Sequence, residues 1–384
     1  MRYPDSHAVD SNSRPVLALL ADLVRINSIN PAYELGCPEA EVANYLEEYF
    51  RRRSIETWQQ EVFPGRPNLI ARLPGRDASR RLIFEAHTDT VGIGGMTIPP
   101  FDPVVSDGRM YGRGSCDTKA GLAAMAYAAV SLKRDGLLPP CEVWVVAAVD
   151  EEHAFGGVRR LLPGLQAAAA VVSEPTQMRV ATASKGVLRW EIQCHGKAAH
   201  SSKPHLGVNA IANMARAILA LEEDSEKLRT VVHPLLGAAT LSVGLIQGGQ
   251  GINVVPELCT IHLDRRLLPA QEIPAVLDYY RGLLSSIPGI SFLPPMLEDG
   301  AMETSCDSEI VQTALRTSRT LGLSHEPVGV PFGTDASKFS RAGIPSIICG
   351  PGNIDQAHAA DEFIECIQVE QAAEFYRNLM LAFV

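Results

Sequence analysis

Short apolar runs alternate with helical stretches in the first half of the chain, and this alternation constrains the fold more than any other feature. Three runs, at residues 82–86, 142–149 and 168–173, have the length and apolar character of buried strands, and polar residues follow them. Helical patterns lie between them, most clearly at residues 118–133, which are rich in Ala, Leu and Met. This order predicts an α/β fold: a mixed, mostly parallel sheet with helices on both faces.

A different pattern begins near residue 185. Residues 186–196 alternate apolar and polar side chains, which is typical of a half-exposed strand. The segments that follow predict a helix at 208–228, strands at 240–247 and 259–268, a helix at 273–287 and a last strand at 290–293. The order βαββαβ predicts a ferredoxin-like α+β domain with an antiparallel sheet.

The helix and strand alternation resumes from residue 308, and residues 344–349 form another apolar run. We therefore predict a catalytic domain in two parts, residues 1–183 and 295–384, with a lid and dimerisation domain inserted at 184–294. A chain of 384 residues agrees with two domains, because single cores stop growing near about 250–300 residues. An antiparallel sheet with helices on one face leaves edges and a face to cover, which favours a homodimer.

The formal charge of −10 would repel phosphate groups, so nucleic acid and anionic membranes are poor partners. No apolar stretch approaches the roughly 18 residues of a membrane span, and the N-terminus lacks a secretory signal pattern. The eight cysteines are scattered singly, without the CxxC spacing of a metal or redox site. We therefore expect a cytoplasmic protein with reduced thiols and a small-molecule substrate.

Acidic and imidazole side chains follow the predicted strands. They are His87 and Asp89 after the first run, Glu151 and Glu152 after the second, Glu174 after the third and His358 after the last, with Asp117 just before the helix at 118–133. Because sites in open α/β sheets gather at the carboxyl ends of strands, these groups can face one pocket. Any one of them alone is more often a cap or a solvated side chain.

Three adjacent carboxylates, at residues 150–152, would repel one another at the end of an apolar strand unless a cation lay beside them. Two imidazoles with several carboxylates and no thiolate favour zinc, with cobalt or manganese as alternatives, whereas calcium prefers oxygen ligands alone. Two ions fit if one carboxylate bridges them. Asp89 lies two residues after His87 and is predicted to accept the second N–H of that imidazole.

Six segments follow one another in a specific order: HTD (87–89), GRGSCDTKAG (112–121), DEE (150–152), SEPT (173–176), GKAAHSSKPHLGVNAI (196–211) and GPGNIDQAH (350–358). This order resembles the M20 metallopeptidase family of acetylornithine deacetylases, succinyl-diaminopimelate desuccinylases and carboxypeptidases. The resemblance covers nearly the whole chain. It implies a zinc-exopeptidase-like catalytic domain and an inserted domain that forms dimers in many members.

The resemblance also implies roles for the residues at the strand ends. His87, Asp117 and Glu174 would hold one zinc ion, and Asp117, Glu152 and His358 the other. Glu151 would be the general base, which accepts a proton from water and passes it to the departing amine. The family further implies a cis peptide bond between Asp117 and Thr118.

Outside the metal ligands, the resemblance implies residues that contact the substrate. His200 would stabilise the oxyanion, from the same subunit or from its partner, and Asn253 would offer an amide. Arg266 would bind the substrate α-carboxylate as a fork, although an ion pair with Asp264 on the same strand explains it equally well. Gly333 and Thr334 would line the substrate end of the pocket.

The leading interpretation of the sequence is an amidohydrolase that removes an acyl group from an N-acyl amino acid. N2-acetyl-L-ornithine deacetylase, a step of arginine biosynthesis, fits best because GPGNIDQAH is closest to that branch of the family. The GTDA segment at 333–336 is more like the carboxypeptidases and aminoacylases. A succinyl-diaminopimelate desuccinylase or an M20 carboxypeptidase or dipeptidase is therefore the alternative, and a non-catalytic metal-binding scaffold is a third reading.

Overall fold

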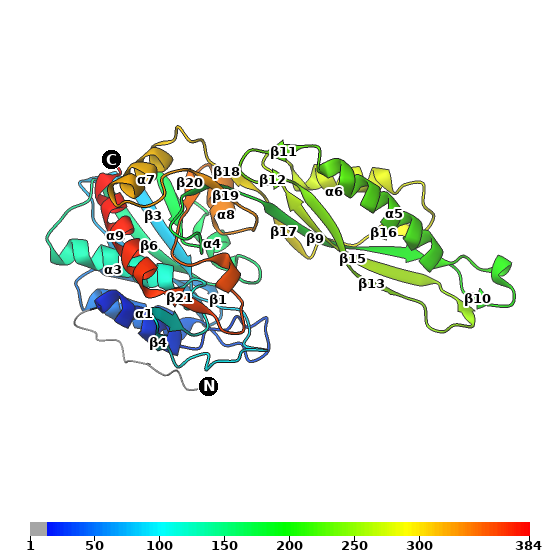
Figure 1. The fold of residues 1–384 in the computed structure, drawn as a ribbon, viewed down its shortest axis with the longest axis horizontal. Helices are drawn as coiled ribbons and strands as arrows, with labels where there is room; N and C mark the ends of the chain where they lie inside the picture. Colours follow the sequence, from blue (N-terminus) through cyan, green and yellow to red (C-terminus); the bar gives the residue numbers. More distant parts are fainter. Residues whose placement is uncertain (1–13) are drawn as a thin grey trace. The chain divides into compact units, whose positions relative to one another are not determined.

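A computed structural model describes residues 14–384 and separates them into two compact units (Figure 1). Unit 1 comprises the chain up to Thr182 together with residues 304–328 and 334–384, and unit 2 comprises residues 183–303 and 329–333. Unit 2 extends beyond residue 294, where the sequence suggested its end, because strand β17 (Leu297–Asp299) pairs with strand β9 (Gly186–His195) of that unit.

Most strands of a nine-stranded mixed sheet lie in unit 1 and form its framework, whereas residues 183–184, 302–303 and 329–330 of this sheet are counted with unit 2. Its order is β1 (Glu56–Phe63), β2 (Arg66–Leu73), β6 (Cys141–Ala148), β3 (Asp77–His87), β7 (Ala169–Val172), β20 (Ser346–Ile348), β8 (Ala181–Ser184) and β18 (Met302–Glu303), with β19 (Val328–Val330) paired to β8. The parallel strands are the four central ones, β6, β3, β7 and β20. Strands β1 and β2 pair antiparallel because only Pro64 and Gly65 connect them.

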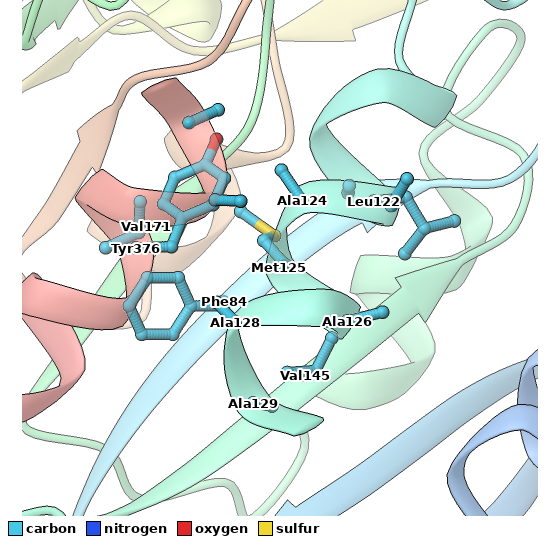
Figure 2. Packing of buried hydrophobic residues seen from close by; sticks show 14 of the residues in the cluster. Phe84, Leu122, Ala124, Met125, Ala126, Ala128, Ala129, Val145, Val171 and Tyr376 are labelled. Atoms are coloured by element: carbon cyan, nitrogen blue, oxygen red, sulfur yellow. The ribbon is translucent and has the colours of Figure 1, made fainter. Parts of the chain in front are cut away.

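Helices α3 (Lys119–Arg134) and α9 (Cys366–Ala382) pack against each other in unit 1 (Figure 1). Helix α3 is buried on nearly every side, so its sequence has small apolar residues all round instead of one apolar stripe. Figure 2 shows Met125 of this helix among Phe84, Val145 and Val171 of the strands, with Tyr376 of α9 next to them. This core holds the carboxyl ends of β3, β6 and β7 in fixed positions.

The other elements of unit 1 complete this core and its surface. They are α1 (Pro15–Arg25), α2 (Ala40–Arg51), α4 (Gly156–Leu161), α7 (Glu309–Thr320), α8 (Ala336–Arg341), the short helix η2 (Ile354–Gln356) and a small sheet of β4 (Val104–Ser106), β5 (Arg109–Tyr111) and β21 (Phe363–Glu365). In the part of the chain that the structure describes, no helix is both long enough and apolar enough to cross a membrane.

Unit 2 contains an antiparallel sheet in the order β13 (Thr240–Gly248), β15 (Leu258–Leu267), β9 and β16 (Ile290–Phe292). With helices α5 (Ala210–Leu228) and α6 (Ile273–Leu283), this is the predicted ferredoxin-like arrangement. Alternate residues of β9 are buried as the sequence indicated, and Trp190 packs on Tyr280 with ring centroids 5.6 Å apart. Short elements complete the unit: β10 (Ala199–His200), β14 (Val254–Val255), β11 (Val232–His233), β12 (Gly237–Ala238) and the helix η1 (Pro204–Leu206).

Candidate metal centre

Three neighbouring parallel strands bring the predicted metal ligands to one edge of the large sheet. His87 is the last residue of β3, Glu174 lies two residues beyond β7, and Glu151 and Glu152 lie just beyond β6. Because β6, β3 and β7 are parallel neighbours, their carboxyl ends meet, and side chains that are far apart in sequence become neighbours. Asp117 enters the same place from the loop before α3.

Asp117 lies between two imidazoles. One of its carboxylate oxygens is 3.1 Å from Nε2 of His87, and the other is 3.3 Å from Nε2 of His358. The same nitrogen of His358 is 3.2 Å from a carboxylate oxygen of Glu152. Two groups result, His87–Asp117–Glu174 and Asp117–Glu152–His358, and within each group the ligand atoms lie within 4.8 Å of one another. Asp117 belongs to both groups, as a bridging ligand would.

The electrostatics of these groups fit bound cations. Burial raises the pKa of Glu174 well above its usual range, and repulsion from Glu151 and Asp117 adds to this effect. Hydrogen bonds with Asp117 and Glu152 raise the pKa of His358 to about 10, since the imidazolium is then the positive charge beside the carboxylates. A metal ion would supply that charge instead, and nitrogen and oxygen donors without a thiolate suit a divalent transition metal.

The carboxylate of Asp89 has a different partner from the predicted one. It accepts the main-chain N–H groups of Glu151 and Glu152, both at 3.1 Å. Nδ1 of His87 lies 2.9 Å from the main-chain oxygen of Asp89 but 3.8 Å from its carboxylate. The carboxylate turns towards these two main-chain donors, and the imidazole uses the carbonyl. Because that carbonyl can only accept, Nδ1 carries the proton and Nε2 is left as a ligand atom.

The start of α3 packs closely against the end of β7. The peptide bond between Asp117 and Thr118 is cis, as the resemblance implied, and the hydroxyl of Thr118 donates to the main-chain oxygen of Ser173 at 2.9 Å. A Cβ at Gly121 would lie 1.7 Å from Oγ of Ser173, so only glycine fits there. This close approach brings Asp117 and Glu174 into one group.

Glu362 is a site residue that the sequence did not indicate. Its buried carboxylate accepts the main-chain N–H groups of Gly114, Cys116 and Asp117 at 2.9 to 3.0 Å, and the guanidinium of Arg113 at 2.6 Å. It therefore fixes the loop that carries the bridging aspartate. Glu362 also follows His358 by four residues, so it ties the two halves of unit 1 together at the centre. A single glutamate in a polar segment carries no local signal of this role.

Two further carboxyl groups lie behind the ligands. Glu85 precedes His87 by two residues on β3, and Asp335 directly precedes α8. Burial raises the pKa of Asp335 to about 6, and burial and the neighbouring Asp335 raise the pKa of Glu85. Thr334, predicted to contact the substrate, is fully buried, and its hydroxyl accepts the main-chain N–H of Ala336 at 3.1 Å. Its role towards a substrate stays a prediction.

The remaining predicted residues belong to unit 2. His200 is exposed, and its Nδ1 is 2.8 Å from Oγ of Ser202; Asn253 is exposed as well. Arg266 donates to both carboxylate oxygens of Asp264, at 2.8 and 3.3 Å, so the ion pair that the sequence offered as an alternative exists. The roles of these three residues towards a substrate stay predictions.

Gly333, also grouped with unit 2, has a structural reason to be glycine. A Cβ at this position would lie 2.2 Å from a carboxylate oxygen of Asp299. Space for the Asp299 side chain therefore explains the glycine without a ligand, and its predicted contact with a substrate stays a prediction.

The comparison with known proteins agrees with this geometry. The model of the Peptidase family M20/M25/M40 matches residues 83–382. The chain belongs to this family. It is 30% identical over 378 residues to an acetylornithine deacetylase of Vibrio campbellii, covering 93% of this chain and 95% of the relative.

Two other similar proteins have different names from the first. A protein of Staphylococcus epidermidis named probable succinyl-diaminopimelate desuccinylase is 26% identical over 409 residues, covering 96% of this chain and 97% of the relative. The solved YXEP protein of Bacillus subtilis, described as a dinuclear metal-binding M20 peptidase, superimposes with a TM-score of 0.72 at 18% identity, covering 96% and 98% of the two chains. This chain is therefore an M20 hydrolase, a family with a dinuclear metal site, and the two groups that share Asp117 could hold the two ions.

Proposed function

We propose that the protein is a di-zinc amidohydrolase that removes an acyl group from an N-acyl amino acid, with N2-acetyl-L-ornithine as its substrate. The observation that carries the hydrolytic part is Asp117, which turns one carboxylate oxygen to each of two histidines. The relative at 30% identity and the GPGNIDQAH segment support the deacetylase assignment.

The donor set suits zinc, with cobalt or manganese as substitutes. His87, Asp117 and Glu174 would hold one ion, and Asp117, Glu152 and His358 the other. When bound, such a pair of ions polarises the scissile carbonyl and lowers the pKa of a water molecule. The protein supplies five side chains for this purpose: His87, Asp117 and Glu174 are buried, Glu152 is partly buried and His358 is half exposed.

Glu151 is the proposed general base. It is partly buried next to Glu152, and the loss of solvent around its carboxylate raises its pKa well above the usual range for a glutamate. A carboxylate with a raised pKa can take a proton from water and return it to the leaving amine. Asp89 holds the main-chain N–H of Glu151 at 3.1 Å, which restricts where this side chain can point.

Unit 2 would supply the groups that recognise the substrate. His200 would stabilise the oxyanion and Asn253 would donate an amide hydrogen. For Arg266 to bind an α-carboxylate, it must use donors that Asp264 leaves free. Residues Gly333 and Thr334 would lie near the side chain of the substrate.

The assembly that we propose is a homodimer through unit 2. Strand β13 lies at the end of its sheet, and its residues Leu245 and Ile246 are exposed at 57% and 55%. An exposed edge with apolar side chains favours pairing with a second copy. In such a dimer His200 could serve the neighbouring subunit.

A succinyl-diaminopimelate desuccinylase, or a carboxypeptidase or dipeptidase, is the second candidate. The Gly333–Thr334–Asp335 segment and the solved peptidases with the same fold favour it. A non-catalytic scaffold is less well supported, because the chain retains Glu151 in addition to every metal ligand.

The test is a hydrolysis screen of the zinc-loaded protein. N-acetylornithine should be cleaved with a higher kcat/KM than N-acetylcitrulline, N-succinyl-diaminopimelate or small dipeptides, and the Glu151→Gln variant provides the background. Preferential cleavage of a dipeptide or of the succinyl compound would replace the proposed substrate. Equal rates for the variant and the native protein would overturn the hydrolase mechanism.

A further inference from the structure

Asn30 lies between two buried carboxylates of unit 1, and neither the family motifs nor the proposed mechanism uses it. The residue is fully buried. Its side-chain nitrogen donates to a carboxylate oxygen of Asp89 at 2.8 Å and to one of Asp150 at 3.0 Å. An amide nitrogen has two hydrogens, so this group is fully used by the two acids.

The main chain and the side-chain oxygen hold Asn30 in place. Its N–H donates to the main-chain oxygen of Thr90 at 2.8 Å, and its main-chain oxygen accepts the N–H of Tyr33 at 2.9 Å. Its side-chain oxygen accepts the N–H of Ala32, also at 2.9 Å. With this oxygen engaged by Ala32, the amide cannot flip without losing contacts on both sides, and its nitrogen must face the acids.

Asp150 is held from its other side by charge. Arg66 donates to the same oxygen of Asp150 at 2.9 Å and forms a two-pronged pair with the buried Glu39 at 2.6 and 2.7 Å. Three carboxylates thus share one guanidinium and one amide group. The amide is the only connection that these hydrogen bonds provide between this ion-paired group and Asp89, in the described part of the chain.

Asp89 connects Asn30 to the main chain of two residues of the candidate metal centre. The oxygen of Asp89 that accepts from Asn30 also accepts the main-chain N–H of Glu152, and its second oxygen accepts that of Glu151. One carboxylate thereby sets the main chain of the proposed base and of a proposed metal ligand. If Asp89 turned, both glutamates would move together.

We propose that Asn30 is a positioning residue of the metal centre, which acts through Asp89 on the main chain of Glu151 and Glu152. Partners that orient metal ligands in this way are worth about 10–100-fold in metal affinity or activity. The inference rests on the proposed roles of Glu151 and Glu152. It adds a residue that lies 59 positions from Asp89 and 120 from Asp150 in the sequence.

The experiment compares Asn30→Ala and Asn30→Asp with Asn213→Asp. The first removes the donor, and the second also adds a carboxyl group against two carboxylates. Asn213 is a matched control, because it is a buried asparagine of unit 2 whose amide donates to the main-chain oxygen of Pro288 at 3.2 Å and contacts neither acid. Asn30→Ala carries the test if Asn30→Asp does not fold.

Two readouts are measured on the full chain. In steady-state hydrolysis, the Asn30 variants should lose kcat by about 10–100-fold with KM within about 3-fold, while the control stays within about 2-fold of the native protein. In titrations with Co²⁺ alone, followed by visible absorption, the Asn30 variants should bind the second equivalent more weakly and show an altered spectrum. The control should match the native titration.

If Asn30→Ala has the same kcat and the same Co²⁺ titration as the control variant, the inference is overturned. A change confined to KM would overturn it as well. Glu151→Gln is measured beside it to separate the two proposals. If Glu151→Gln is inactive and Asn30→Ala behaves like the control, only the positioning role fails. If Glu151→Gln remains active, the proposed mechanism itself fails, whereas the Co²⁺ titration still reports whether Asn30 orders the ligands.

Discussion

The residues of the metal centre and the residues predicted to bind substrate are held in opposite ways. In unit 1, His87 and Asp117 are almost inaccessible, and each has protein partners on every polar atom that matters for metal binding. In unit 2, His200 and Asn253 are exposed, and the nearest polar partner of His200 is Ser202. The difference indicates that the fold holds these two candidate metal ligands in place in advance, whereas it leaves the residues predicted to contact the substrate exposed.

Of the changes considered, metal removal should have the largest effect on hydrolysis. We expect up to two equivalents of zinc or cobalt per subunit, because the two ligand groups share Asp117. Treatment with a chelator should reduce hydrolysis to background, and zinc should restore it. Metal analysis after dialysis checks the stoichiometry; binding of calcium alone, or of no metal, would refute the centre. His200→Ala should bind the same number of ions as the native protein.

The adjacent glutamates should separate chemistry from metal binding. Glu151→Gln should keep its metal and lose about 10²–10⁴-fold in kcat, the usual contribution of a positioned acid–base group. Glu152→Gln should instead weaken metal binding, since its carboxylate lies 3.2 Å from His358 in the second ligand group. Steady-state kinetics and metal analysis distinguish the two. The reverse pattern would mean that the two roles are exchanged.

Glu362→Gln should lower the stability of unit 1 strongly. The substitution leaves Arg113 buried without its charge partner, and breaking a buried pair in this way costs about 3–5 kcal/mol. His200→Ala is the matched comparison in unit 2, where an exposed substitution should change the free energy of unfolding by no more than about 0.5 kcal/mol. Urea unfolding of the metal-free proteins measures both. Similar losses for the two variants would contradict the contrast drawn between the regions.

The smallest expected change is the partial recovery of hydrolytic activity in mixed dimers. If His200 serves the neighbouring subunit, equal amounts of His200→Ala and Glu151→Gln should exchange subunits and regain about a quarter of native activity. Half of the dimers are then mixed, and each of these has one intact site of two. Hydrolysis is measured after subunit exchange has been verified with two differently tagged chains. No recovery would assign His200 to its own subunit, and a monomeric mass in solution would remove the proposed dimer.

The sequence by itself indicated the main elements of the fold and the candidate metal ligands. Local periodicity is enough to distinguish the alternating residues of β9 from the buried run of β3, because side-chain direction repeats every two residues in a strand. The positions of His87, Glu152 and Glu174 after such runs then indicated a shared site, since parallel strands end at one edge.

Only the tertiary structure decided which atoms meet. That Asp89 turns to the amides of Glu151 and Glu152 instead of to His87 depends on a loop more than 60 residues away. The same is true of Asn30 and of Glu362, whose partners lie in distant segments and whose own surroundings in the sequence are unremarkable. Local pattern fixes the direction of a side chain, but the choice among competing hydrogen-bond partners depends on packing, because a buried polar group takes whichever donor or acceptor the folded chain brings within reach.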